Sequence, residues 1–309
     1  MRSRPARPDD IEGLAALIDA SRPADGALPP ASRDAIVEHI RRDLDAPQGQ
    51  FGWLILEDGT AAIHIAVIPP PPIYEGGIVG VMLGHWTTSG GAAEQILAAA
   101  ETHFHERRVT KLIGAAPAGG AMASALQQHA YRPTVHYMAK RLTNTTPAEA
   151  VRTAAVSDIP ALVAFNREAR ARLHEANPDF WLSHAEADTR FGLWMKFSLT
   201  MRDRSMLMSD PGPGFIIAQP ASPIQLPITA DAQTVGVIDD FHDATFGTSL
   251  RHERAGTSGA ELLAAAENDF IARGKTAALA ICPAAWTAKQ ALLVRAGYTT
   301  NHLWFVKPL

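Results

Sequence analysis

Three residues whose side chains can exchange protons lie close together in the second half of the chain. Asp239, Asp240 and His242 continue the apolar run 235–238, and the whole stretch predicts one strand. Because side chains alternate between the two faces of a strand, only one of the two aspartates can face a given cleft. Histidine titrates near neutral pH, so His242 is a further candidate base, although packing or surface exposure also explains it. The chemistry indicated is removal of a proton from a substrate.

A segment of small residues follows this strand and precedes an Ala/Leu-rich stretch that predicts a helix. Small residues let backbone N–H groups approach a phosphate, and the helix dipole adds partial positive charge at the same place. An arginine at the edge adds a charge-assisted contact. Ser258 and Glu261 also have the spacing of a capping box, so helix structure alone is a second interpretation of these two residues. The candidate phosphate-binding residues are Arg254, Ala255, Gly256, Thr257, Ser258 and Gly259.

The segments around these residues have counterparts in the first half of the chain. The stretch Leu97–Phe104 matches Leu263–Phe270 at an offset of 166 residues. Val79–Met82 matches Val235–Ile238, and a Pro-rich connector precedes both. The other matched pairs are 4–18 with 152–165, 125–131 with 291–298, and 137–142 with 304–309. Five echoes in the same order indicate a duplicated domain of about 150 residues.

The polar, Pro-containing stretch 143–148 is the natural linker between the copies. The sequence therefore predicts domains at 1–145 and 147–309. Within each copy the order is strand, helix, helix, strands, helix, strand, helix, strand, which predicts an α/β fold with helices on both faces of a sheet.

Composition places the chain among globular proteins and excludes several classes of partner. The chain has 309 residues, 47% hydrophobic and 19% charged, and a net charge of −4. The charge is balanced in both halves, so we expect no nucleic-acid partner. No apolar run reaches the length of a membrane span, so we expect no membrane partner. The single cysteine, Cys282, and the acidic residues after the short basic N-terminus favour a cytoplasmic protein.

The repeated pattern of strand, small-residue loop, Ala/Leu-rich helix, buried strand and closing helix resembles the GNAT superfamily of acyltransferases, and two copies resemble its tandem members. The resemblance implies two GNAT-like domains, each a mixed, mostly antiparallel twisted sheet. It implies acetyl-CoA as co-substrate, held by the loop Arg254–Gly259 and by the strand backbone, including Phe241. Thr257 stands where the family has its first glycine. The first-half counterpart, Thr88–Ala93, lacks the initial basic or amide residue.

The family's usual acid, a tyrosine on the last helix, is absent from both copies, which have Leu126 and Leu293 at that position. The resemblance assigns a base role to a carboxylate near the central strand, and only the second copy has Asp239 and Asp240 there. The aligned positions in the first copy are Leu83 and Gly84.

We therefore expect an acyl-CoA-dependent N-acyltransferase whose C-terminal domain carries the reaction on Asp239, Asp240 and His242. The alternative is a non-catalytic protein whose degenerate domains bind acyl-CoA or another small ligand. In either case the first copy is expected to be the more degenerate one. We expect a small-molecule or peptide amine acceptor, no metal, and a monomer or homodimer.

Overall fold

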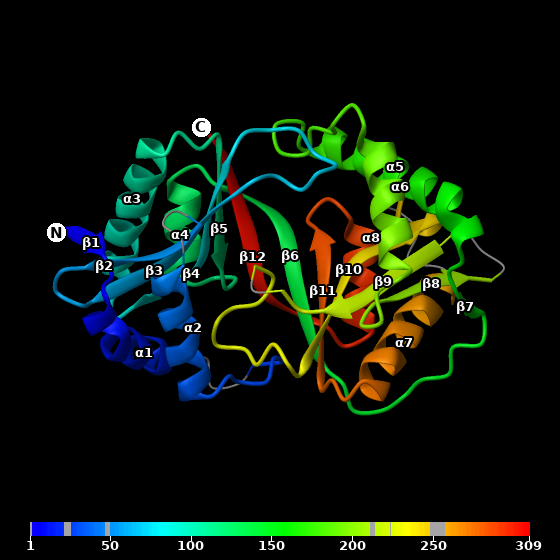
Figure 1. Cartoon of the computed structure of the whole chain (residues 1–309), viewed down its shortest axis with the longest axis horizontal. Coiled ribbons are helices and arrows are strands. Elements are labelled where there is room, and N and C mark those ends of the chain that lie inside the picture. Colours follow the sequence, from blue (N-terminus) through cyan, green and yellow to red (C-terminus); the bar gives the residue numbers. More distant parts are fainter. Residues whose placement is uncertain (1, 22–25, 47–49, 211–213, 223, 248–256) are drawn as a thin grey trace.

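The computed structural model places all strands in one twisted twelve-stranded sheet, with helices on both faces (Figure 1). It describes residues 2–21, 26–46, 50–210, 214–222, 224–247 and 257–309. The first half contains β1 (Ser3–Pro5), α1 (Ile11–Ala20), α2 (Arg33–Asp45), β2 (Phe51–Leu56), β3 (Ala61–Ile68), β4 (Val79–Thr87), α3 (Gly90–Glu106), β5 (Lys111–Ala116), α4 (Ala121–Gln128) and β6 (Arg132–Arg141). The second half contains β7 (Val151–Thr153), α5 (Ile159–Ala176), α6 (Ala187–Ser198), β8 (Ser205–Ser209), β9 (Gly214–Pro220), β10 (Val235–Asp243), α7 (Thr257–Ala272), β11 (Ala277–Pro283), α8 (Thr287–Arg295) and β12 (Thr299–Pro308). Short 3-10 turns lie at η1 (Pro8–Asp10), η2 (Val156–Asp158) and η3 (Ala244–Gly247).

The two halves have the same order of elements, and the predicted α/β class with a mostly antiparallel sheet and helices on both faces is confirmed. In the first half, α3 and α4 pack on one face of the sheet, and α1 and α2 pack on the other. In the second half, α7 and α8 share one core, while α5 and α6 pack with β8 and β9 in another. Among the described residues, no helix is long and apolar enough to cross a membrane.

The repeat extends to individual contacts. Arg4 binds Asp10 at 2.7 Å, and Arg152 binds Asp158 at the same distance, at the entry to the first helix of each half. A Cβ on Gly80 would lie 2.6 Å from the ring of Phe104, and one on Gly236 would lie 2.3 Å from the ring of Phe270. Both strand glycines are therefore required by the close approach of a helix phenylalanine.

The halves exchange their last strands at the centre of the sheet. The strand order is β1-β2-β3-β4-β5-β12-β6-β11-β10-β9-β8-β7. The last strand of the second half, β12, thus lies between β5 and β6 of the first half, while β6 lies between β12 and β11. In Figure 1 β6 and β12 run side by side through the middle of the molecule.

Two ion pairs related by the repeat hold this exchange in place. Lys140 on β6 donates to Glu267 on α7 at 2.7 Å, and Lys307 on β12 donates to Glu101 on α3 at 2.9 Å. Each lysine thus comes from one half and each glutamate from the other. Each ammonium also lies over a tyrosine ring, Tyr298 for Lys140 at 5.6 Å and Tyr131 for Lys307 at 5.3 Å.

The Pro-rich connectors also cross between the halves. The β3–β4 connector of the first half reaches the α5–α6 connector, where the Glu75 N–H donates to the Leu182 carbonyl at 2.6 Å. The β9–β10 connector of the second half reaches the start of the first, where the Ala31 N–H donates to the Thr229 carbonyl at 2.8 Å. Each connector therefore covers part of the opposite half.

The predicted boundary near residue 146 falls between β6 and β7, and as a domain boundary it stays a prediction. The strand exchange gives it a testable consequence, because residues 147–309 alone would lack β6 and leave the edge of β11 uncovered. An uncovered edge strand pairs with other chains. We expect the fragment 147–309 to aggregate or self-associate in size-exclusion chromatography with light scattering. Co-expression with residues 1–146 should give a one-to-one complex, whereas a monomeric fragment that unfolds cooperatively would contradict the expectation.

Candidate functional site

The predicted aspartates lie where the central strand of the second half leaves its parallel neighbour. The pairing of β10 with β11 ends at Ile238 and Ala280. On its other side β10 stays paired with β9, but the register shifts between Ile238 and Phe241. Asp239 and Asp240 are therefore the bulged residues at the point where the two parallel strands separate. Bulges of this kind re-aim side chains and occur beside active sites.

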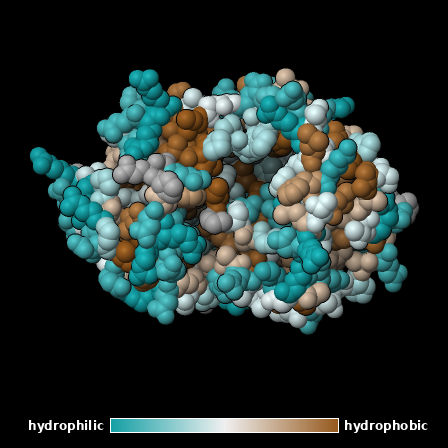
Figure 2. Space-filling view, in the orientation of Figure 1, coloured by the Kyte–Doolittle hydropathy of each residue, from teal (hydrophilic) through white to brown (hydrophobic). Residues whose placement is uncertain are grey.

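Gln219 and Arg204 interact with the two carboxylates, and we call these four residues the carboxylate recess. Asp239 is exposed and Asp240 is half-buried. Asp239 is two residues after Val237 and so lies on the same face of β10. Val237 packs there in a core shared with residues of β6. Gln219 Nε2 donates to Asp239 Oδ2 at 3.3 Å. Figure 2 shows the molecule hollowed between its two halves on the face viewed there.

The surroundings of the recess disfavour ionisation of the pair. Burial raises the pKa of Asp239. Burial also raises the pKa of Asp240, and the adjacent Asp239 charge raises it further, to about 7. Both groups are strongly desolvated although solvent reaches Asp239, which fits carboxylates at the bottom of a recess. With a pKa of about 7, the Asp240 carboxyl can take up or release a proton near neutral pH.

Two cations act on the carboxylates. Arg204 precedes β8, stacks on the Trp194 ring at 4.7 Å, and has a buried Nε without a hydrogen-bond partner in the described part of the chain. Lys289 on α8 is buried, and its Nζ donates to the Ile281 carbonyl at 2.9 Å. Burial lowers the pKa of both cations, and the negative charges of Asp239 and Asp240 oppose this shift. The recess thus combines acidic and basic groups.

The first half contributes two tyrosines to this region. Burial raises the pKa of Tyr74 above its ordinary range, and the charges of Asp240 and Asp239 add to the effect. Tyr74 lies on the crossing β3–β4 connector and packs against Trp181 at 5.1 Å. Tyr137 on β6 is buried, and burial together with the Asp239 charge raises its pKa. Neither tyrosine could be predicted as part of this site, because nothing in the sequence shows that these segments cross into the second half.

His242 and Phe241 point to other environments. His242 is buried between aromatic rings, 5.0 Å from Phe165, and neither of its ring nitrogens has a hydrogen-bond partner among the described residues. Burial lowers the pKa of His242 to about 4, so it is neutral at neutral pH. Phe241 packs against Phe246 at 4.9 Å, under the ammonium of Lys289. The structure therefore does not bring His242 together with the aspartates.

The start of α7 holds a carboxylate. Asp243 is buried at the end of β10 and accepts a hydrogen bond from Ser258 Oγ. A Cβ on Gly259 would lie 3.4 Å from Asp243 Oδ2. The described part of α7 starts at Thr257, and the capping-box interpretation of Ser258 and Glu261 stays a prediction. The predicted contacts Arg254, Ala255 and Gly256 lie outside the described residues, as does the side chain of Thr257.

The described start of α7 thus places the Asp243 carboxylate beside Ser258 and Gly259, two of the predicted phosphate contacts. The first-half helix α3 differs. Its N-cap Ser89 makes no side-chain capping bond, its first turn has no acidic residue, and Gly91 borders open space. The expected asymmetry between the two loops stays a prediction, because residues 248–256 lie outside the described part of the chain.

The positions where the family has its tyrosine acid are part of the core in both halves. Leu126 and Leu293 are almost completely buried among apolar side chains. Cys282 is buried as well, and burial raises the pKa of its thiol to about 11. The thiol is therefore protonated and unsuited to act as a nucleophile at neutral pH.

Comparison with solved structures identifies the fold. A GCN5-related N-acetyltransferase from Sphaerobacter thermophilus superposes with a TM-score of 0.61 at 18% identity, covering 99% of this chain and 95% of that one. A GCN5-related glucosamine N-acetyltransferase region of a fungal multi-domain GH3 β-N-acetylglucosaminidase gives a TM-score of 0.57 at 15% identity, covering 98% of this chain and 38% of that one. No family model matches the sequence, and neither does any curated protein. The chain has the fold of the GCN5-related N-acetyltransferases along its whole length, as the sequence resemblance implied.

The raised pKa of Asp240 predicts a pH-dependent effect on stability. An acid whose pKa rises on folding is penalised when ionised, so its contribution to stability falls as pH rises from its ordinary 3.8 to about 7. Asp240→Asn lacks this penalty. We expect the variant to unfold in urea with a free energy about 1–3 kcal/mol above wild type near pH 8, and with little difference near pH 4. The exposed Asp45→Asn is the control, and an equal Asp240→Asn effect at both pH values would contradict the expectation.

Proposed function

We propose that the protein transfers an acyl group from acetyl-CoA to a primary amine, with the reaction in its C-terminal half. The fold supports acyl transfer, and one observation carries the assignment to this half. Asp239 and Asp240 occupy the bulge where β10 and β11 separate, and the pKa of Asp240 is raised to about 7. The counterpart positions in the first half, Leu83 and Gly84, have no side chain that can accept a proton.

The carboxylate recess has the properties that an amine acceptor requires. An amine arrives as an ammonium ion, and two carboxylates attract it. The amine must lose a proton before it can attack a carbonyl, and a base whose pKa lies near the working pH does this best. Asp240 has such a pKa, while Asp239 stays within reach of solvent and can return the proton to water. Tyr74 and Arg204 supply polar groups around the acceptor.

When bound, acetyl-CoA supplies the activated acyl group. Backbone N–H groups released by the bulge at Asp239 and Asp240 are the candidate donors to its carbonyl oxygen. The anionic end of the co-substrate must be accommodated beside Asp243, or must displace its carboxylate from the start of α7. Phe241 and Gly259 flank this path, whereas His242 takes no part in the proposed reaction.

A second candidate function is acyl-CoA or small-ligand binding without turnover. The Asp243–Ser258 contact at the start of α7 and the buried Leu126 and Leu293 favour it. Turnover across a panel of amines separates the two functions, because tight binding of acetyl-CoA with no thiol release would support the non-catalytic one.

Replacement of the two aspartates should affect different kinetic constants. Asp240→Asn should lower kcat/KM by about 10²- to 10⁴-fold, as loss of a general base does, and should abolish the rise of rate with pH through about 7. Asp239→Asn should chiefly raise KM, because one charge that attracts the ammonium is lost. Free thiol released from acetyl-CoA measures both effects. The exposed Asp45→Asn serves as control, and an unchanged pH profile in Asp240→Asn would exclude Asp240 as the base.

Removing the charge at the start of α7 should favour an anion there. Asp243→Asn retains a hydrogen-bond acceptor for Ser258 but no longer repels a phosphate. We expect CoA to bind about three- to tenfold more tightly to this variant, since a charge at a helix terminus contributes about 1 kcal/mol. Asp34→Asn, in the first turn of α2, is the matched control. Isothermal titration checks the result, and unchanged or weaker CoA binding in Asp243→Asn would place the pyrophosphate elsewhere.

A further inference from the structure

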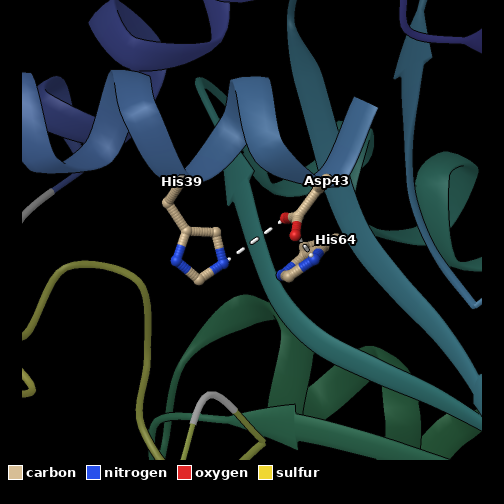
Figure 3. Close-up of side chains that lie close together, drawn as sticks. All are labelled: His39, Asp43 and His64. Atoms are coloured by element: carbon tan, nitrogen blue, oxygen red, sulfur yellow. Dashed lines mark ion pairs between the residues drawn. The ribbon is translucent and has the colours of Figure 1, made fainter. Parts of the chain in front are cut away.

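The first half contains a cluster of metal-ligating side chains that the proposed reaction does not use. His39 and Asp43 lie one turn apart on α2, and His64 faces them from β3 (Figure 3). His39 Nε2 lies 3.4 Å from Asp43 Oδ2, and His64 Nε2 lies 2.9 Å from the same oxygen. One ligand atom from each residue lies within 4.8 Å of the others. A cation about 2.0–2.2 Å from each atom fits such spacings.

The contact between His64 and Asp43 is close but poorly directed for a hydrogen bond. His64 is 3% exposed, and its Nε2 has no hydrogen-bond partner among the described residues, although Asp43 Oδ2 is only 2.9 Å away. The ring thus approaches the carboxylate without the geometry of a donor. A buried imidazole nitrogen left without a hydrogen bond is costly. A cation between the nitrogen and the oxygen would satisfy both.

The surroundings hold the ligands in place. The Trp53 indole N–H donates to Asp43 Oδ2 at 3.2 Å, and the Trp53 ring stacks on His64 at 4.5 Å with an angle of 9° between the planes. Such outer contacts fix the orientation of carboxylate and imidazole ligands in metal sites. The position is therefore organised by one tryptophan acting on both buried ligands.

The cluster is also accessible from outside. The His39 side chain is 23% exposed, compared with 9% for Asp43 and 4% for His64. Asp43 and Trp53 also line a surface recess of about 340 Å³. Three protein ligands with one open side leave a position for water or another ligand, as in zinc sites with an exchangeable fourth position.

We propose that His39, Asp43 and His64 form a binding site for one divalent transition-metal ion, with Zn²⁺ the ion that best matches two imidazoles and a carboxylate. The site ties α2 to β3 on the face where α1 and α2 cover the sheet. The metal site shares no residue with the carboxylate recess, so a test of metal binding does not depend on the proposed acyl transfer.

Metal titration of the full-length, untagged protein tests the proposal. After treatment with a chelator, equilibrium dialysis against Zn²⁺ with elemental analysis should recover one ion per chain. Co²⁺ should give the strong visible absorption of a four-coordinate site. His39→Gln should weaken Zn²⁺ binding at least about tenfold, and Trp53→Phe, which removes the donor to Asp43 and part of the ring stacked on His64, about 10- to 100-fold. Zn²⁺ should raise the Tm of wild type by more than that of His39→Gln.

The controls separate this site from adventitious binding. His105→Gln changes an exposed histidine on α3 and should leave the stoichiometry, affinity and Co²⁺ spectrum unchanged. Because His39 is partly exposed, His39→Gln keeps the test valid if variants of the buried His64 do not fold. Absence of a retained ion, equal Zn²⁺ affinity in His39→Gln and wild type, or loss of the ion in His105→Gln would overturn the proposal.

Discussion

The antiparallel contact between β6 and β12 is the constraint on which the remaining architecture depends. β6 is the last strand of the first half and pairs with β11 of the second, while β12 is the last strand of the second half and pairs with β5 of the first. The single sheet therefore exists only when both halves are present. The lysine of each strand pairs with the helix glutamate of the opposite half, Lys140 with Glu267 and Lys307 with Glu101. Breaking a largely buried pair leaves an uncompensated charge, so these contacts also oppose any shift of register between β6 and β12.

The same exchange explains why the candidate site of one half is built partly by the other. Because β6 follows β11 in the sheet, Tyr137 of the first half lies close enough to Asp239 for the two to interact electrostatically. Because the β3–β4 connector also reaches the second half, Tyr74 interacts electrostatically with Asp240 and Asp239. The C-terminal recess is therefore a property of the whole chain. Its acidic groups come from one copy, and part of its aromatic wall comes from the other.

Much of the fold could be predicted from the sequence, because local patterns determine it. The echoes at Val79 and Val235, and at Leu97 and Leu263, mark strands and helices that the structure confirms. The exchange could not be predicted, since both β6 and β12 are apolar terminal strands and nothing in the sequence shows which strands they pair with. The aspartates were found because they interrupt an apolar strand, but Tyr74, Arg204 and Lys289 were missed because they reach the recess from distant segments. His39 and His64 show no pattern until α2 lies on β3.

The two copies have diverged in how the same bulge is filled. At the position of Asp240 the first half has Gly84, and a Cβ there would lie 2.6 Å from the Trp86 ring, which stacks on Trp53 at 5.2 Å. Aromatic packing thus takes the space that the second half uses for a carboxylate. His64, paired with Gly84 across β3 and β4, then lies against Trp53 and faces Asp43. The same register shift in the central strand is therefore surrounded by carboxylates in the second half and by aromatic rings beside a His/Asp cluster in the first.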